Sequence, residues 1–263
     1  MNIIRHLRHR LPSLFPRRMH VYCIGAAKTG TTSVAAMFKP EYLSAHEAEI
    51  ETLNHKIIQY LENEIDSKDM ESFILERDKR LKLEIESSHP MGYISDILAN
   101  NFPEAKFVIT IREPQSWLRS RLNFHHKVDP PAWREYREYF WLRPHKGHSE
   151  AEKPLAQYSL SSLDVYLNQY ADHYRRVLDA VPHEQRLIIK THELKNSTDT
   201  LAQFVGITGE CLHTSHSNRE PNKILPLENM DENYVKDKIW QHCEFIIRQY
   251  FPETLEDYSH ANN

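Results

Sequence analysis

The chain has 263 residues, of which 40% are hydrophobic and 27% charged, with only 6 glycines against 14 prolines. This length and composition favour one large globular domain and exclude a low-complexity chain. The formal net charge of −4 argues against general nucleic-acid binding, which usually needs a strongly basic balance.

Cysteine usage and hydropathy exclude further classes. Cys23, Cys211 and Cys243 are odd in number, widely separated and without metal-ligand spacing, so neither a disulfide framework nor a structural zinc is expected. Reduced thiols in a cytoplasmic protein are the preferred interpretation. No run of 18 apolar residues is present, so no membrane span is predicted.

Residues 1–19 form a basic N-terminal segment without acidic residues or the apolar centre of a secretory signal. Ile3, Leu7 and Leu11 recur every four residues, which indicates one face of a short helix ending near Pro12. Such a helix either contacts a membrane surface or partner, or packs on its own domain. The packed helix is the favoured alternative.

The first half of the chain alternates between strands and helices. In order, we predict a buried strand at 20–24, a helix from 31 to 38, a short strand at 42–45, a helical region at 47–80 with a break near 66–67, a strand at 81–86, a helix at 93–101 and the clearest central strand at 106–111 (KFVITI). Pro114 suits the first turn of the next helix, which continues through residues 117–124.

The second half continues the alternation. In order, we predict a long amphipathic helix at 161–181, a buried strand at 186–190 (RLIIK), a helix at 194–205 and a final helix at 232–250. This order predicts an α/β fold with three α/β/α layers around a mostly parallel sheet, similar to P-loop NTPases. Ligands of such sheets bind beyond the carboxyl ends of the strands. The loops after Ile24 and Ile111 lie at that edge.

The loop after the first strand, Gly25-Ala26-Ala27-Lys28-Thr29-Gly30-Thr31-Thr32, has the pattern of a phosphate-binding loop before a helix. Its glycine spacing matches the Walker A pattern, but Thr31 follows Gly30 where that pattern has lysine. The lysine lies earlier, at Lys28, which suits a donor without a γ-phosphate. Hydroxyl groups can supply further donors around the same anion, from Thr29, Thr31, Thr32 and Ser33.

The segment YCIGAAKTGTTSV resembles the 5′-phosphosulfate loop of sulfotransferases that use 3′-phosphoadenosine-5′-phosphosulfate (PAPS). That family also has a central strand ending in Arg-[Asp/Asn]-Pro and a serine on the next helix. Here Arg112-Glu113-Pro114 ends the strand, and Ser120 lies eight positions beyond Arg112. The resemblance implies that Arg112 and Ser120 bind the 3′-phosphate. It extends over roughly residues 20–250, and only these two segments are specific.

The resemblance implies further site residues. The donor-binding set is Ala27, Lys28, Thr29, Gly30, Thr31, Thr32, Ser33, Arg112 and Ser120. The segment HTSHSNREPNK resembles the family's loop over the nucleotide, so Ser217, Asn218, Arg219 and Lys223 are further candidates, or belong to a solvated polar loop. No metal is implied, and the product is adenosine 3′,5′-bisphosphate.

Lys28 is the candidate for stabilising charge on the leaving phosphate. The base that takes the acceptor proton is a Glu or a His in different branches of the family. Glu47 is favoured here and His46 is close behind, since both follow the second strand; His89, in IESSHP, is the third candidate. The alternative for the first two is an ordinary helix N-terminus with an exposed histidine.

The acceptor is not identified by any motif. Aromatic and basic residues alternate near 124–156, which indicates either an acceptor-binding lid inserted in the domain of residues 20–263 or a helix with a buried aromatic face. A small molecule or a glycan is expected, with no nucleic acid, and the oligomeric state is open. A P-loop small-molecule kinase and a non-catalytic nucleotide-binding protein are the alternative functions, and the missing Mg²⁺-binding Asp disfavours the kinase.

Overall fold

A computed structural model describes residues 15–127, 130–213 and 226–262. The chain divides into two compact units, which we call the sheet unit and the helical unit. The sheet unit comprises the described residues of Met1–Ile111 and Arg176–Arg219, and the helical unit those of Arg112–Arg175 and Glu220–Asn263. A single domain over 20–263 stays a prediction. Most of the basic segment 1–19 lies outside the described residues.

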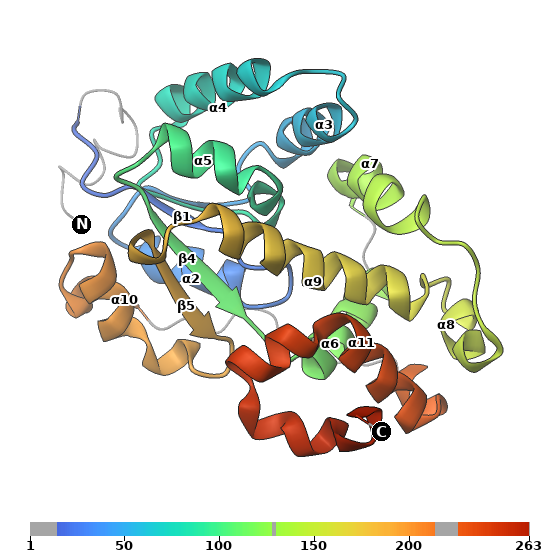
Figure 1. Cartoon of the computed structure of the whole chain (residues 1–263). Coiled ribbons are helices and arrows are strands. Elements are labelled where there is room, and N and C mark those ends of the chain that lie inside the picture. Colours follow the sequence, from blue (N-terminus) through green and yellow to red (C-terminus); the bar gives the residue numbers. More distant parts are fainter. Residues whose placement is uncertain (1–14, 128–129, 214–225, 263) are drawn as a thin grey trace. The chain divides into compact units, whose positions relative to one another are not determined.

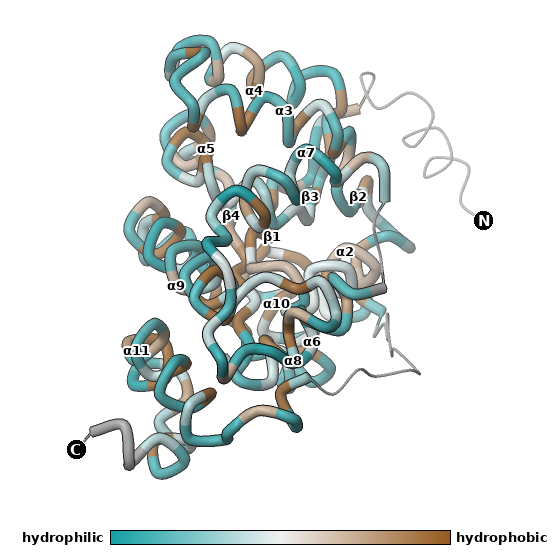
Figure 2. The backbone as a smooth tube through the Cα atoms, turned by 90° about the vertical axis from the view of Figure 1, so that its right-hand side faces the viewer, coloured by the Kyte–Doolittle hydropathy of each residue, from teal (hydrophilic) through white to brown (hydrophobic). Residues whose placement is uncertain are grey.

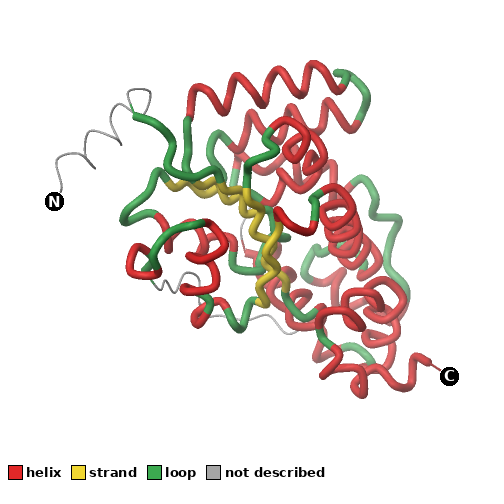
Figure 3. The backbone as a smooth tube through the Cα atoms, turned by 60° about the vertical axis from the view of Figure 1, so that its left-hand side comes forward, coloured by secondary structure: helices red, strands yellow, loops and turns green. Residues whose placement is uncertain are grey.

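The sheet unit is built on parallel strands. Among the residues that the structure describes, five strands form one sheet in the order β2–β3–β1–β4–β5, every pair being parallel. They appear in yellow in Figure 3. The strands are β1 (Val21–Cys23), β2 (Ser44–His46), β3 (Ile85–Ser87), β4 (Lys106–Ile111) and β5 (Arg186–Lys190). The predicted α/β fold with a parallel sheet is confirmed.

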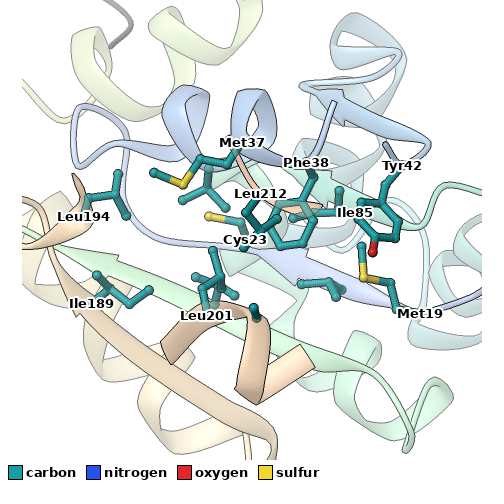
Figure 4. Close-up of a cluster of buried hydrophobic side chains, with 14 residues drawn as sticks. Met19, Cys23, Met37, Phe38, Tyr42, Ile85, Ile189, Leu194, Leu201 and Leu212 are labelled. Atoms are coloured by element: carbon teal, nitrogen blue, oxygen red, sulfur yellow. The ribbon is translucent and has the colours of Figure 1, made fainter. Parts of the chain in front are cut away.

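Helices cover both faces of this sheet. They are α2 (Thr31–Phe38), α3 (Ile50–Leu61), α4 (Ser67–Leu81), α5 (Ser95–Asn101) and α10 (Thr198–Val205). Met37 and Phe38 from α2 and Leu201 from α10 pack on Cys23 and Ile189 of the sheet, as Figure 4 shows. Figure 1 shows α4 and α5 on the opposite side. Each large apolar side chain buried in such a core contributes about 1.5–3 kcal/mol to folding.

β1 is the central strand of the sheet, with β3 on one side and β4 on the other. The chain leaves β1 toward β2 and β3, and then crosses to β4 and β5. The loop after β1 therefore lies where the strand order reverses. Ligand sites of open α/β sheets form at this position, outside the carboxyl ends of the strands.

One predicted strand was placed too early. Residues 81–84 are not in a strand, because α4 continues to Leu81 and Lys82 then adopts a left-handed conformation with φ 48°. The Lys82 N–H bonds the Asp78 carbonyl at 2.8 Å and caps the helix. β3 therefore begins only at Ile85. The helix predicted at 93–101 also differs, since η2 (His89–Ile94), a 3₁₀ helix, precedes α5.

The helical unit is formed by helices that precede, lie within and follow the insertion near 124–156. They are α6 (Pro114–Lys127), α7 (Arg134–Arg137), α8 (Lys153–Gln157), α9 (Leu163–Ala180) as far as Arg175, and α11 (Glu232–Tyr250). α11 carries both hydrophobic and hydrophilic residues along its length in Figure 2, and its buried positions recur every three or four residues and so form one apolar face. Its Lys238 and His242 side chains both bond Asp164 of α9, at 2.8 and 2.7 Å.

Among the described residues of the insertion near 124–156, three aromatic side chains are buried, and Phe124, Trp133 and Tyr139 are partly exposed. Tyr136, Phe140 and Trp141 are at most 5% exposed, whereas Arg134 and Arg143 are exposed. The aromatic side of this insertion is therefore core in the helical unit, as the helix alternative expected. A role of the insertion as an acceptor lid stays a prediction.

Candidate functional site

The loop between β1 and α2 runs directly against β4. A Cβ atom on Gly25 would lie 2.1 Å from Thr110 Oγ1 and 2.5 Å from the Thr110 carbonyl oxygen. Only glycine allows this approach, because two of the nearest three atoms belong to the β4 backbone and cannot rotate away. The first glycine of the motif is thus explained by strand packing.

Substituting Gly25 with alanine is expected to displace this loop. The added methyl group overlaps Thr110, so the variant should lose about 1–3 kcal/mol of unfolding free energy. Chemical denaturation measures this loss. A wild-type unfolding free energy would show that the loop tolerates a side chain at this position.

The end of the loop presents backbone N–H groups. Lys28 has φ 69° and Gly30 has φ 107°, both in the left-handed region. Gly30 is the N-cap of α2, and no side chain caps that helix end. The first N–H groups of a helix have no intrahelical acceptor, so they attract an anion together with the helix dipole. The predicted Thr31, Thr32 and Ser33 occupy this first turn.

Three threonines attach the loop to β4 and to the end of β5 by hydrogen bonds. The Thr29 side chain is fully buried; its hydroxyl donates to the Ala26 carbonyl and lies 2.6 Å from Thr110 Oγ1. Thr191, which follows β5, donates to the Thr29 carbonyl at 2.7 Å. The Thr29 hydroxyl, predicted as a ligand donor, is thus engaged within the loop. The roles of Thr110 and Thr191 were not predicted, since neither belongs to the motif.

The three candidate bases come together at the carboxyl edge of the sheet. His46 is paired with Ser87 in the register of β2 and β3, so residues that follow the two strands are neighbours. Glu47 Oε2 lies 3.6 Å from His46 Nδ1, and Glu47 Oε1 lies 3.3 Å from His89 Nδ1. Glu47 therefore stands between two imidazole rings. His89 is buried, and His46 and Glu47 are partly exposed.

This cluster contacts the phosphate loop. His46 Nε2 lies 3.1 Å from Thr32 Oγ1 and 3.4 Å from Thr31 Oγ1, at the start of α2. Burial lowers the pKa of His46, and the Glu47 carboxylate acts in the opposite direction. Burial is the larger of these effects and favours the neutral form of His46. Ser87 adds a further link by donating to the Thr31 carbonyl at 2.7 Å.

The helical unit begins with Arg112, in the segment predicted to bind the 3′-phosphate. Arg112 Nε bonds Ser116 Oγ at 2.9 Å, and Ser120 lies four residues further on the same face of α6. Glu113 carboxylate oxygens accept from the N–H groups of Gln115 and Ser116, at 2.8 and 2.7 Å, and so cap α6. Glu113 thus acts as the N-cap of α6, a role in which Asp is common. Ser116 was not predicted, although its i,i+4 spacing from Arg112 and Ser120 was readable.

Other predicted residues add less. Ala27 is half-buried in the loop. Asn218 and Lys223, with Ser217 and Arg219, lie outside the described residues. In the described part of the chain no group of three or more His, Cys, Asp or Glu side chains is arranged to hold a metal ion. None of the described helices combines the length and apolarity that crossing a bilayer requires.

Comparison with known proteins matches residues 20–209 to the family described as Sulfotransferase domain. The Ava biosynthesis cluster protein M of Aspergillus versicolor is 28% identical over 105 residues, which take in 36% of this chain and 39% of that protein. The chain thus spans well under half of this curated relative. A solved sulfotransferase structure from Alicyclobacillus acidocaldarius aligns with a TM-score of 0.48 and 18% identity, over 89% of this chain and 96% of that chain.

Proposed function

Because the chain belongs to the sulfotransferase family, we propose that it transfers a sulfuryl group from PAPS to a hydroxyl or amine of a small-molecule or glycan acceptor. The proposal rests on one observation above all. His46 Nε2 lies 3.1 Å from Thr32 Oγ1 in the first turn of α2, its Nδ1 lies 3.6 Å from the Glu47 carboxylate, and that carboxylate also faces His89. Groups able to take a proton thus lie next to a helix end suited to an anion.

The loop fits the 5′-phosphosulfate of the donor. The N-terminus of α2, which no side chain caps, and the left-handed backbone at Lys28 offer N–H groups to a sulfonate and a phosphate. The Lys28 side chain adds a positive charge. PAPS supplies an activated sulfuryl group and a phosphate leaving group. Lys28 neutralises the charge that develops on the phosphate oxygen during transfer. Arg112 and Ser120 bind the 3′-phosphate, with Ser116 holding the Arg112 guanidinium.

Transfer requires one bond to form and one to break. The acceptor oxygen or nitrogen bonds to sulfur while the bond from sulfur to the 5′-phosphate oxygen breaks, which releases adenosine 3′,5′-bisphosphate. Glu47 takes the acceptor proton. His46 and His89 each place ring nitrogen Nδ1 opposite one Glu47 oxygen, at 3.6 and 3.3 Å, and so flank the carboxylate on two sides.

Calorimetric titration tests the donor. We expect adenosine 3′,5′-bisphosphate to bind at least roughly tenfold more tightly than ATP, with the same affinity with or without Mg²⁺. Arg112→Gln should weaken binding of the bisphosphate and leave binding of adenosine 5′-phosphate unaffected, because only the bisphosphate carries a 3′-phosphate. Mg²⁺-dependent binding of ATP, with no binding of the bisphosphate, would contradict the proposal and favour a small-molecule kinase.

A further inference from the structure

The segment between β2 and α3, residues 47–49, has an unusual backbone. Glu47 has φ 55° and Glu49 has φ 49°, so two side-chain-bearing residues adopt the left-handed conformation within three positions. L-residues rarely adopt this region, and they keep it only where the surrounding structure holds them there. The carboxylate that the proposed function needs is carried by the first of these residues.

Arg77 of α4 is the group that reaches this segment from the protein interior. Its side chain is 3% exposed, and one guanidinium nitrogen, NH2, donates to the Ala48 carbonyl at 2.6 Å. Ala48 lies between the two left-handed residues. Arg77 Nε also lies 3.6 Å from Glu49 Oε2. The buried arginine therefore contacts the segment through the backbone of one residue and the side chain of the next.

Glu86 of β3 fixes the direction of the guanidinium. Its two carboxylate oxygens accept from both terminal nitrogens of Arg77, at 2.7 and 2.5 Å, and it is 4% exposed. The next strand residue, Ser87, accepts from the Glu47 N–H at 2.9 Å. Two connections therefore join this backbone to β3. The Glu47 N–H bonds Ser87 directly, and the Ala48 carbonyl is connected to Glu86 through Arg77. A planar fork is required, since a lysine ammonium cannot serve Glu86 bidentately and Ala48 together.

We propose that Arg77 is a positioning residue that, paired with Glu86, holds residues 47–49 in the conformation that places the Glu47 carboxylate between His46 and His89. This proposal rests on the proposed role of Glu47 in sulfuryl transfer. Arg77 acts through the Ala48 carbonyl and not by contact with the reacting groups. The conformation of the segment, and with it the position of Glu47, depends on this buried pair.

The test removes the pair as a unit. In Arg77→Met/Glu86→Met both buried charges are lost together, which avoids leaving one of them unpaired. We expect kcat to fall roughly 10- to 100-fold, because a small displacement of a catalytic group has that effect, while the affinity for adenosine 3′,5′-bisphosphate is unchanged. Arg80→Met is the matched control, because Arg80 is on the same helix and forms an exposed ion pair with the same Glu49. It should keep wild-type kcat.

A second readout needs no turnover. NMR titration of the His46 imidazole, assigned with His46→Gln, follows the raising effect of the Glu47 carboxylate on the His46 pKa. The midpoint should fall in Glu47→Gln and fall likewise in the double variant. A folded double variant with the wild-type midpoint and kcat would overturn the proposal. Should it fail to fold, Arg77→Lys is measured in the same way.

The two proposals fail differently. Absence of sulfuryl transfer by the wild-type protein would overturn the proposed function, whereas the His46 midpoint still reports whether Arg77 positions Glu47. Normal transfer by wild type and double variant alike would overturn only the positioning role.

Discussion

Replacing Glu47 with glutamine is expected to reduce turnover by about 10²–10⁴-fold, the usual contribution of a general base. The amide keeps the shape of the side chain but cannot take the acceptor proton. Donor binding should be unchanged, since the α2 N-terminus and Lys28 are untouched. Turnover is measured as PAPS-dependent release of adenosine 3′,5′-bisphosphate with phenolic, alcoholic and sugar acceptors, and affinity by calorimetry.

Controls separate the three members of the cluster. Glu51→Gln, an exposed carboxylate in the first turn of α3, should retain wild-type turnover. His46→Ala and His89→Ala should each reduce turnover by less than Glu47→Gln. If Glu47→Gln remains active while either histidine variant is inactive, that histidine is the base and Glu47 only orients it.

Replacing Lys28 with methionine is expected to lower kcat by about 10²–10³-fold, the loss typical when one preorganised charge-stabilising group is removed. Methionine keeps the unbranched shape, so the left-handed backbone at this residue is perturbed little. The fold-decrease in kcat should exceed the fold-decrease in bisphosphate affinity. The reason is that the proposed role of the lysine is to stabilise charge that develops during transfer. Steady-state kinetics and calorimetry give the two numbers.

Lys39→Met is the matched control for the charge itself. Lys39 is the exposed C-cap residue at the opposite end of α2, and its removal should leave kcat at the wild-type value. Equal losses of kcat and of bisphosphate affinity in Lys28→Met would instead assign the lysine to ground-state binding.

The regular elements could be predicted where the hydrophobic pattern is continuous. β4 and β5 match their predicted bounds because KFVITI and RLIIK are apolar runs with clear polar ends. α11 also matches, since its apolar positions recur with helical spacing over its whole length. β3 was misplaced because the left-handed Lys82 that ends α4 carries no glycine signal.

The candidate site was predicted as separate residues but not as an arrangement. Glu47, His46 and His89 were weighed as alternatives, whereas the pairing of β2 with β3 places them in one cluster. A single sequence does not show which strands pair, so this juxtaposition was not readable. Arg77 was equally hidden, because an arginine in a charged helix looks like a surface residue until its burial is known.

The threonine anchors behind the loop have a consequence for binding kinetics. Thr29 is tied to Thr110 and, through its carbonyl, to Thr191, so the protein's own hydrogen bonds attach the loop to β4 and to the end of β5. A loop that is held in this way loses little conformational entropy when a ligand binds. Anion capture at the α2 N-terminus should then proceed at the rate of diffusional encounter, with no slow rearrangement of the loop.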